Sequence, residues 1–132
     1  MEIFRTQRPE ILRWVLPHIV ADEESTQEAI IEFLLTLMIS KPEDICVAIA
    51  IDGEELIGCT IGWIVRNHVW LGQSYLDSAY DREVGLEAID IVKDWGREKN
   101  LIDIRFETKR SAKALSRAWG FEEYSSIMRM EL

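Results

Sequence analysis

The side chains with most potential for chemistry are few and scattered through this sequence of 132 residues. Cys46 and Cys59 lie in apolar stretches typical of strands, and His18 and His68 stand alone. No C-x-x-C pair or Cys/His spacing suited to a metal is present, so the sequence excludes a zinc framework. Because no histidine or aspartate pairs with either thiol in a recognisable pattern, we interpret both cysteines as buried core residues.

Positive charge is concentrated near the C-terminal end, in Arg105, Lys109, Arg110, Lys113 and Arg117. Lys109, Lys113 and Arg117 are four residues apart and share one face of a predicted helix. The chain as a whole is acidic, with a formal net charge of −9. An acidic surface repels polyphosphates and anionic lipids, which argues against nucleic acid or a membrane surface as the partner.

Hydrophobic periodicity and turn signals predict the elements that must position these side chains. Asp52-Gly53 lies between two apolar runs and indicates a hairpin with a type I′ turn, and Asn67-His68 indicates a second turn. Gly58 and Gly62 suggest a bulge or a close backbone approach in the middle strand. The expected strands are Ile3–Thr6, Ile45–Ile51, Glu55–Val65, Val69–Leu76, Ile102–Glu107 and Phe121–Leu132. The expected helices are Pro9–Val20, kinked at Pro17, a second helix capped by Ser25 or Thr26 and closed by Pro42, Arg82–Lys99 with Asn100 as its cap, and Ala112–Gly120.

This order, β-α-α-β-β-β-α-β-α-β, predicts an α+β fold with one mixed, mostly antiparallel sheet flanked by helices. Its length suits a single domain spanning residues 1–132. Val69–Leu76 and Ile102–Glu107 are expected to be adjacent parallel strands that splay at one end and form the main cleft, because the helix between them is a right-handed crossover. The absence of an apolar signal core and the isolated cysteines favour a cytoplasmic protein without a membrane span.

The segment 111–121 resembles the A-x-x-L-Y-x-x-x-G-F segment of the GNAT (N-acetyltransferase) superfamily. Ala112, Leu115, Gly120 and Phe121 match it. A second segment, residues 75–80 leading into the following helix, resembles the family's strand, D-P-x-Y/F and phosphate-loop segment. The element order is also GNAT-like, so the resemblance covers nearly the whole chain.

Two departures from the family pattern affect the expected site. The nearest match to the diphosphate loop Q/R-x-x-G-x-G/A is residues 82–87, where Glu87 replaces the last small residue. A second register, counted from Tyr80, puts Arg82 and Val84 at small positions and Asp81 at a basic one. Ser116 stands where many family members carry the tyrosine that protonates the leaving thiolate, and a serine hydroxyl is a far weaker acid than a phenol.

The resemblance implies a role for several residues. The implied catalytic residues are Tyr75, Asp77 and Ser116, and the implied cofactor-binding residues are Leu76, Arg82, Val84, Gly85, Lys109, Arg110 and Lys113. The alternatives are that Asp77 is a turn residue before Ser78, which we favour, and that the basic segment is a solvated face. We interpret Tyr80 and four of the five tryptophans as core residues, and Trp70 as a residue that could line a cleft.

The function that the resemblance implies is transfer of an acyl group from acetyl-CoA or another acyl-coenzyme A to a small amine or to an amino group of a protein. The family places acceptor contacts near His18 and the acidic segment 22–25, which could attract an amine or simply favour solubility. The alternative is a GNAT-like domain that has lost catalysis and serves as a binding or structural module, as a monomer or a homodimer. No metal is expected.

Overall fold

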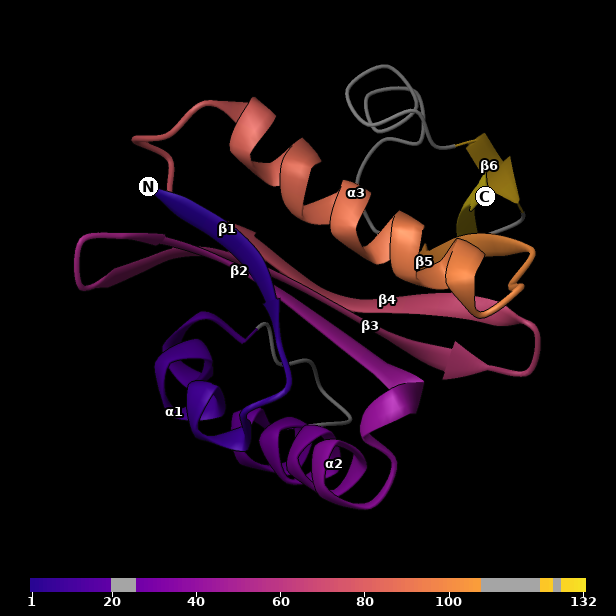
Figure 1. The fold of residues 1–132 in the computed structure, drawn as a ribbon, viewed down its shortest axis with the longest axis horizontal. Coiled ribbons are helices and arrows are strands. Elements are labelled where there is room, and N and C mark those ends of the chain that lie inside the picture. Colours follow the sequence, from indigo (N-terminus) through magenta and orange to yellow (C-terminus); the bar gives the residue numbers. More distant parts are fainter. Residues whose placement is uncertain (20–25, 108–121, 125–126) are drawn as a thin grey trace.

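A mixed sheet forms the centre of the molecule (Figure 1). The computed structural model describes residues 1–19, 26–107, 122–124 and 127–132. Within these ranges the strands lie in the order β1-β2-β3-β4-β5-β7-β6, and every neighbouring pair is antiparallel except β4 and β5. The strands are β1 (Glu2–Thr6), β2 (Ile45–Asp52), β3 (Glu55–Val65), β4 (His68–Leu76), β5 (Asp103–Glu107), β6 (Glu122–Tyr124) and β7 (Ile127–Glu131). The predicted mixed, mostly antiparallel sheet is confirmed.

The C-terminal part of the sheet differs from the prediction of one strand over Phe121–Leu132. The structure has two short strands, β6 and β7, that pair antiparallel with Tyr124 opposite Ile127. The prediction was wrong because the sequence Tyr-Ser-Ser-Ile carries no glycine, proline or asparagine to indicate a turn. The predicted helix Ala112–Gly120 lies outside the described residues.

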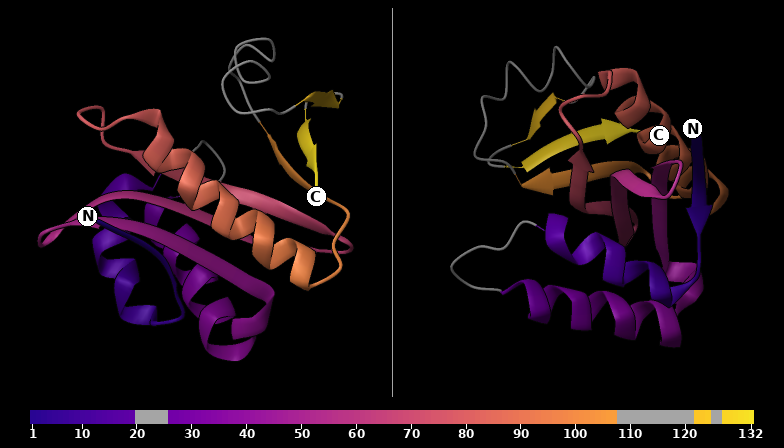
Figure 2. Two further views of the ribbon diagram at one scale, coloured as in Figure 1. Left: turned by 45° about the horizontal axis from the view of Figure 1, so that its top comes forward. Right: turned by 90° about the vertical axis from the view of Figure 1, so that its left-hand side faces the viewer.

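Helices cover both faces of the sheet (Figure 2). The N-terminal helices lie on one face and α3 lies on the other. The helical segments are η1 (Pro9–Ile11), α1 (Leu12–Val15), η2 (Leu16–His18), α2 (Gln27–Ser40), η3 (Pro42–Asp44) and α3 (Arg82–Glu98), where η marks a 3-10 helix. None of the helices in the described ranges has the length and apolarity that a membrane crossing requires.

The first helical region is three short segments instead of one helix over Pro9–Val20. Pro17 lacks an N–H and its ring crowds the preceding turn, so an α-helix cannot continue through it. The chain therefore tightens into the 3-10 turn η2, where the Ile19 N–H donates to the Leu16 carbonyl at 3.2 Å. The predicted interruption at Pro17 is confirmed, and it ends the α-helical part at Val15.

Both long helices are capped, α2 at the predicted residue Thr26 and α3 at Asp81, which the sequence analysis does not name as a cap. Thr26 caps α2, because its hydroxyl oxygen accepts the Ala29 N–H at 3.1 Å. Asp81 caps α3 in the same way through the Glu83 N–H at 3.2 Å. Asn100 adopts the left-handed conformation with φ 58° just beyond the last turn of α3.

Both predicted hairpin turns exist, but each differs in detail from the prediction. The loop between β2 and β3 consists of Gly53 and Glu54, since Asp52 pairs with Glu55. Among its residues only Gly53 has a positive φ, of 64°, which is the pattern of a type II′ turn and not of type I′. The loop between β3 and β4 is Arg66-Asn67, so His68 is the first residue of β4 and not a turn residue.

Glycines in β3 and β4 allow close packing and a bulge, as expected for the middle strand. Gly58 and Gly62 lie where a Cβ would crowd the sheet; at Gly62 it would approach Val69 Cγ1 to 2.9 Å and Val92 Cγ1 to 3.2 Å. One bulge lies on β3 itself, because Ala50 pairs with Gly58 while Ile51 pairs with Leu56, which leaves Ile57 as the extra residue. A second bulge lies on the partner strand β4, because Ile61 pairs with Gln73 while Gly62 pairs with Leu71. Gly72 is the additional residue, and it leaves room for the ring of Trp63.

The sheet divides the core into two apolar clusters. The cluster on the α3 side includes Cys46, Val69, Val92, Trp95 and Ile104. The cluster on the other side is formed by residues of the first two helices packed against β2 and β3, with Leu12, Val15, Leu34, Ile49 and Ile61 among the most buried.

We expect Gly62→Ala to lower the free energy of unfolding by about 1–3 kcal/mol, because a methyl group at this site overpacks the contact between the sheet and α3. Urea denaturation measures this change. Glu54→Ala is the control, since Glu54 is exposed in the loop between β2 and β3 and its truncation overpacks nothing. Equal losses for the two variants would contradict the packing argument.

Candidate active site

The two parallel strands β4 and β5 separate after a short stretch of pairing. They pair only at Val69 with Ile104 and at Trp70 with Arg105, although β4 runs on to Leu76 and β5 to Glu107. The bulge at Gly72 lies where the pairing ends, and Figure 2 shows β5 and β7 turning away from the plane of β1–β4. The predicted splay is therefore confirmed. That the splayed ends form the main cleft stays a prediction, because residues 108–121, which follow β5, lie outside the described residues.

The main chain at the end of β4 presents an N–H group toward this opening. The Asp77 N–H donates to the Ile57 carbonyl of β3 at 2.8 Å. Successive N–H groups of a strand alternate between its two edges. The Leu76 N–H therefore lies on the opposite edge, which faces β5 and the opening. This agrees with the expected position of Leu76 in the site.

Asp77 is held in a turn at the end of β4. Its Oδ1 atom accepts the Ala79 N–H at 2.9 Å, and its carbonyl oxygen accepts the Tyr80 N–H at 3.0 Å. These are the bonds of an Asx-type turn. The structure thus favours the interpretation of Asp77 as a turn residue.

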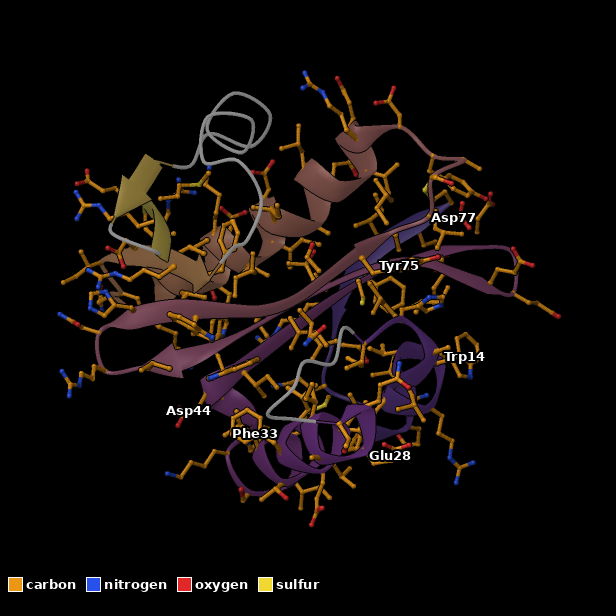
Figure 3. All side chains as sticks on the ribbon, turned by 180° about the vertical axis from the view of Figure 1, so that it is seen from behind. Trp14, Glu28, Phe33, Asp44, Tyr75 and Asp77 are labelled. Atoms are coloured by element: carbon orange, nitrogen blue, oxygen red, sulfur yellow. The ribbon has the colours of Figure 1, made fainter. Side chains whose placement is uncertain are left out.

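Tyr75 lies on the face of the sheet that the first two helices cover (Figure 3). Its ring stacks on His18 of η2, with 3.9 Å between the ring centroids and 15° between the planes. Burial, and then the negative charge of Asp77, raise the pKa of the Tyr75 phenol. Tyr75 is therefore protonated at neutral pH, so it can donate a hydrogen bond but cannot act as a base. Its contact with His18 is not indicated by any spacing in the sequence.

Tyr80 joins the turn before α3 to the β2–β3 hairpin. Its hydroxyl donates to Asp52 Oδ2 at 2.7 Å, and this bond is the main cause that raises the pKa of Tyr80 to about 12. The ring is only half-buried. The expectation that Tyr80 is a core residue was wrong, because a polar partner close to the surface holds it there.

The first turn of α3 contains the residues that the sequence assigns to a diphosphate site. Arg82 is exposed, Val84 is half-buried, and Gly85 is buried. Two of the N–H groups at this end are already bonded to Asp81, because Glu83 donates to its carboxylate and Val84 to its carbonyl. The Asp81 carboxylate therefore occupies part of the helix N-terminus where an anion would bind.

Of the predicted basic segment, only Arg105 lies within the described residues. Its Nε atom donates to both oxygens of Asp103 at 3.2 Å. Asp103 is fully buried, and its Oδ1 also lies 2.6 Å from His68 Nδ1. Arg105 thus offsets the charge of a buried carboxylate and His68 contacts it within hydrogen-bond distance, roles that the sequence analysis missed for both. The other predicted residues, Lys109, Arg110, Lys113 and Ser116, lie outside the described residues.

Aromatic side chains extend along the same face as Tyr75. Trp63 lies against Phe33 of α2 in an edge-to-face contact, with 5.2 Å between the ring centroids. Trp63 and Trp70, which pair across β3 and β4, are half-buried, and Trp95 is buried. Trp14 exposes 49% of its surface, so its assignment to the core was wrong. Trp119 lies outside the described residues.

The chain is similar in structure to solved acetyltransferases. PaiA N-acetyltransferase from Thermoplasma acidophilum, solved in complex with coenzyme A, matches with a TM-score of 0.72 and 19% identity over 100% of both chains. An acetyltransferase of the GNAT family from Staphylococcus aureus Mu50 gives a TM-score of 0.75 and 16% identity, covering 99% of this chain and 98% of that one. Aminoglycoside 6′-N-acetyltransferase AAC(6′)-Ig from Acinetobacter haemolyticus gives a TM-score of 0.74 and 16% identity, covering 95% of this chain and 93% of that one.

The chain has the GNAT fold. No family model matches the sequence, and no curated protein matches it. At identities below one fifth, the likeness to these GNAT structures establishes the arrangement of the chain and not its activity. In the described part of this GNAT domain, no three His, Cys, Asp or Glu side chains gather to hold a metal ion.

We expect Cys46 and Cys59 to resist alkylation in the native state. Both thiols are buried, and burial raises the pKa of each to about 12, so almost no thiolate exists at pH 8. Mass spectrometry after iodoacetamide treatment checks this, with full labelling expected in urea. Rapid labelling of either cysteine without denaturant would show that the thiols are accessible.

Proposed function

We propose that this protein is an acyl-coenzyme A-dependent N-acyltransferase acting on a small amine or on an amino group of a protein. The observation that carries the proposal is the opening between β4 and β5, with the Leu76 N–H on its edge. A buried main-chain donor at such an edge can hold a thioester carbonyl and stabilise the negative charge that develops when an amine attacks. The GNAT fold of the chain and the coenzyme A complex of the PaiA enzyme support this assignment.

Acetyl-CoA or another acyl-coenzyme A would supply the activated acyl group as a thioester. In the proposed site, Leu76 holds the carbonyl oxygen, and the first turn of α3 with Arg82 and the basic residues Lys109, Arg110 and Lys113 holds phosphates. Val84 and Gly85 belong to this first turn, where Val84 is half-buried and Gly85 is buried. Because Gly85 has no side chain, it would contribute through its main chain.

The acceptor amine would approach from the face covered by α1 and α2, where Tyr75 and His18 stack. Tyr75 offers a hydroxyl donor that orients the acceptor, and the imidazole of His18 or a water molecule takes the proton from the attacking amine. Because Asp77 is bonded in its turn, we give it a positioning role at the end of β4. With Ser116 in place of a tyrosine, water delivers the proton to the leaving thiolate.

The second candidate function is a coenzyme A-binding or structural module without catalysis. The specific observation that favours it is Asp81, whose carboxylate caps α3 at a position that is basic in one register of the family loop. Titration with acetyl-CoA, with and without a panel of amines, separates the two functions. Thermal stabilisation together with release of free thiol supports the enzyme, and stabilisation without thiol release supports the module.

We expect coenzyme A at 100 times its dissociation constant to add ~2.7 kcal/mol to the stability of the wild-type protein. The double variant Lys109→Glu/Lys113→Glu should abolish the thermal shift, since it reverses the charge proposed to bind phosphate. Arg97→Glu/Lys99→Glu is the matched control, because it changes the net charge equally at the C-terminal end of α3. If the thermal shift with coenzyme A is lost in Lys109→Glu/Lys113→Glu and kept in Arg97→Glu/Lys99→Glu, the phosphate site is supported. If both double variants keep the thermal shift, the phosphate site is ruled out.

We also expect Asp81→Asn to tighten coenzyme A binding, because asparagine still caps the helix but removes a negative charge beside the proposed diphosphate position. Isothermal titration calorimetry at low and high salt measures the gain, which should shrink as salt screens it. Asp90→Asn, an exposed carboxylate further along α3, is the control and should bind like the wild type. Equal affinities for all three proteins would place the diphosphate elsewhere.

A further inference from the structure

The segment that joins β4 to α3 has few contacts with the rest of the molecule. Residues 78–83, which form this turn and the start of the helix, are all exposed except the half-buried Tyr80. Their hydrogen bonds are mostly local, such as those from the Ala79 N–H to Asp77 and from the Glu83 N–H to Asp81. Exposed segments that are held only by local bonds open at a low cost in free energy.

One side-chain bond connects this segment to a distant element. The Tyr80 hydroxyl donates to Asp52 Oδ2 at 2.7 Å, although the two residues are 28 positions apart. Asp52 is the last residue of β2, and Figure 1 shows the β2–β3 hairpin and the turn before α3 at the same end of the sheet. Within the described ranges, no second side-chain hydrogen bond or ion pair links residues 78–83 to another element.

The acceptor of this bond is itself held in place. Asp52 pairs with Glu55 across the loop of the hairpin, so its main chain belongs to the sheet. A hydrogen bond from a phenol to a carboxylate is stronger than one between two neutral groups. The same bond is the main cause that raises the pKa of Tyr80 to about 12, so the hydroxyl keeps its proton at neutral pH and remains a donor. The sheet thus fixes Asp52, and Asp52 fixes the turn.

We propose that Tyr80 and Asp52 are a positioning pair that orders the first turn of α3 for the diphosphate of the acyl donor. This role rests on the proposed function, because it assumes that coenzyme A binds at the start of α3. Arg82 is the first residue of the helix, where main-chain N–H groups have no partner within the helix. Ordering these groups before the donor arrives lowers the entropy cost of binding. Neither Tyr80 nor Asp52 contacts the donor; both act through the turn.

The pair also affects which donors the protein uses. A coenzyme A thioester carries a diphosphate and gains affinity from an ordered helix start. A shorter acyl-pantetheine thioester has no diphosphate and gains nothing from it. The pair therefore favours the complete coenzyme A thioester as the donor.

A purely structural role for the bond has different consequences. A bond that only stabilises the fold lowers the melting temperature when it is lost, but it leaves the affinity of the folded protein for coenzyme A unchanged. A positioning pair instead changes this affinity, and the local order of the turn, at temperatures where the whole protein stays folded.

Isothermal titration calorimetry of Tyr80→Phe, well below its melting temperature, separates the two roles. We expect the variant to bind coenzyme A roughly threefold to tenfold more weakly than the wild type, which is the effect of losing one hydrogen bond. Dephospho-coenzyme A keeps the diphosphate but lacks the 3′-phosphate, and it should show the same loss. An unchanged affinity of Tyr80→Phe overturns the proposal, and a loss confined to coenzyme A overturns the assignment to the diphosphate.

A double-mutant cycle tests whether the two residues act as a pair. Asp52→Ala also removes a negative charge, so Glu54→Ala is the matched control: Glu54 is an exposed carboxylate in the same hairpin. Asp52→Ala should bind coenzyme A more weakly than Glu54→Ala does. In the Tyr80→Phe background the two alanine variants should have equal affinities, because the bond is already lost. Losses that simply add would show that the residues act independently and would overturn the pair.

Hydrogen exchange measured without coenzyme A tests the order of the turn directly. In Tyr80→Phe the N–H groups of residues 79–84 should exchange faster, while those of β2 and β3 exchange as in the wild type. Equal exchange at residues 79–84 in the two proteins overturns the positioning role. A wild type that binds no coenzyme A overturns the proposed function and this role together, whereas a wild type that binds it no better than Tyr80→Phe overturns the pair alone.

Discussion

The buried carboxylate of Asp103 fixes the strand geometry on which the candidate site depends. A buried charge without partners is costly, and this one is satisfied by His68 at the start of β4 and Arg105 on β5. Both partners lie where the two strands pair, so the carboxylate holds one end of the pair together. The bulge at Gly72 then bends β4, and the strands separate toward the end that carries Leu76. The opening is a consequence of this fixed end and the bulge.

Electrostatics decides how well that opening can receive a polyphosphate. The opening lies at the N-terminal end of α3, which attracts anions through its dipole and free N–H groups. In this chain, however, Asp81 provides an anion of its own and Glu83 adds a second carboxylate in the same turn. The same aspartate that starts the helix would therefore compete with a diphosphate bound in the proposed position. A site of this kind needs compensating positive charge, for which the sequence offers Lys109, Arg110 and Lys113.

The sequence predicts most elements because their signals are local, and it misses contacts that depend on register. The period of Ala88, Val92 and Trp95 predicted α3 and its buried face, and all three are buried. By contrast, the stack of His18 on Tyr75 joins a 3-10 turn to a strand far along the chain, and no spacing indicates it. The partners of Asp103 likewise follow only from the parallel register of β4 and β5. The crossover helix predicted the splay, and the sequence favoured Asp77 as a turn residue. The region of the site, which the family resemblance implies, stays a prediction. Nothing in the sequence indicated the bond of Tyr80 to Asp52.

The composition of α2 shows how much of a helix the fold of one chain covers. A helix that is apolar on nearly all sides is normally buried on nearly all sides. Leu34 and Met38 are buried, Ile31 packs against the same core, and Phe33 lies against Trp63. Leu35 and Ile39 remain exposed, with 37% and 66% of their surface accessible. These two side chains are the part of the apolar surface of α2 that the contacts of the described residues do not cover.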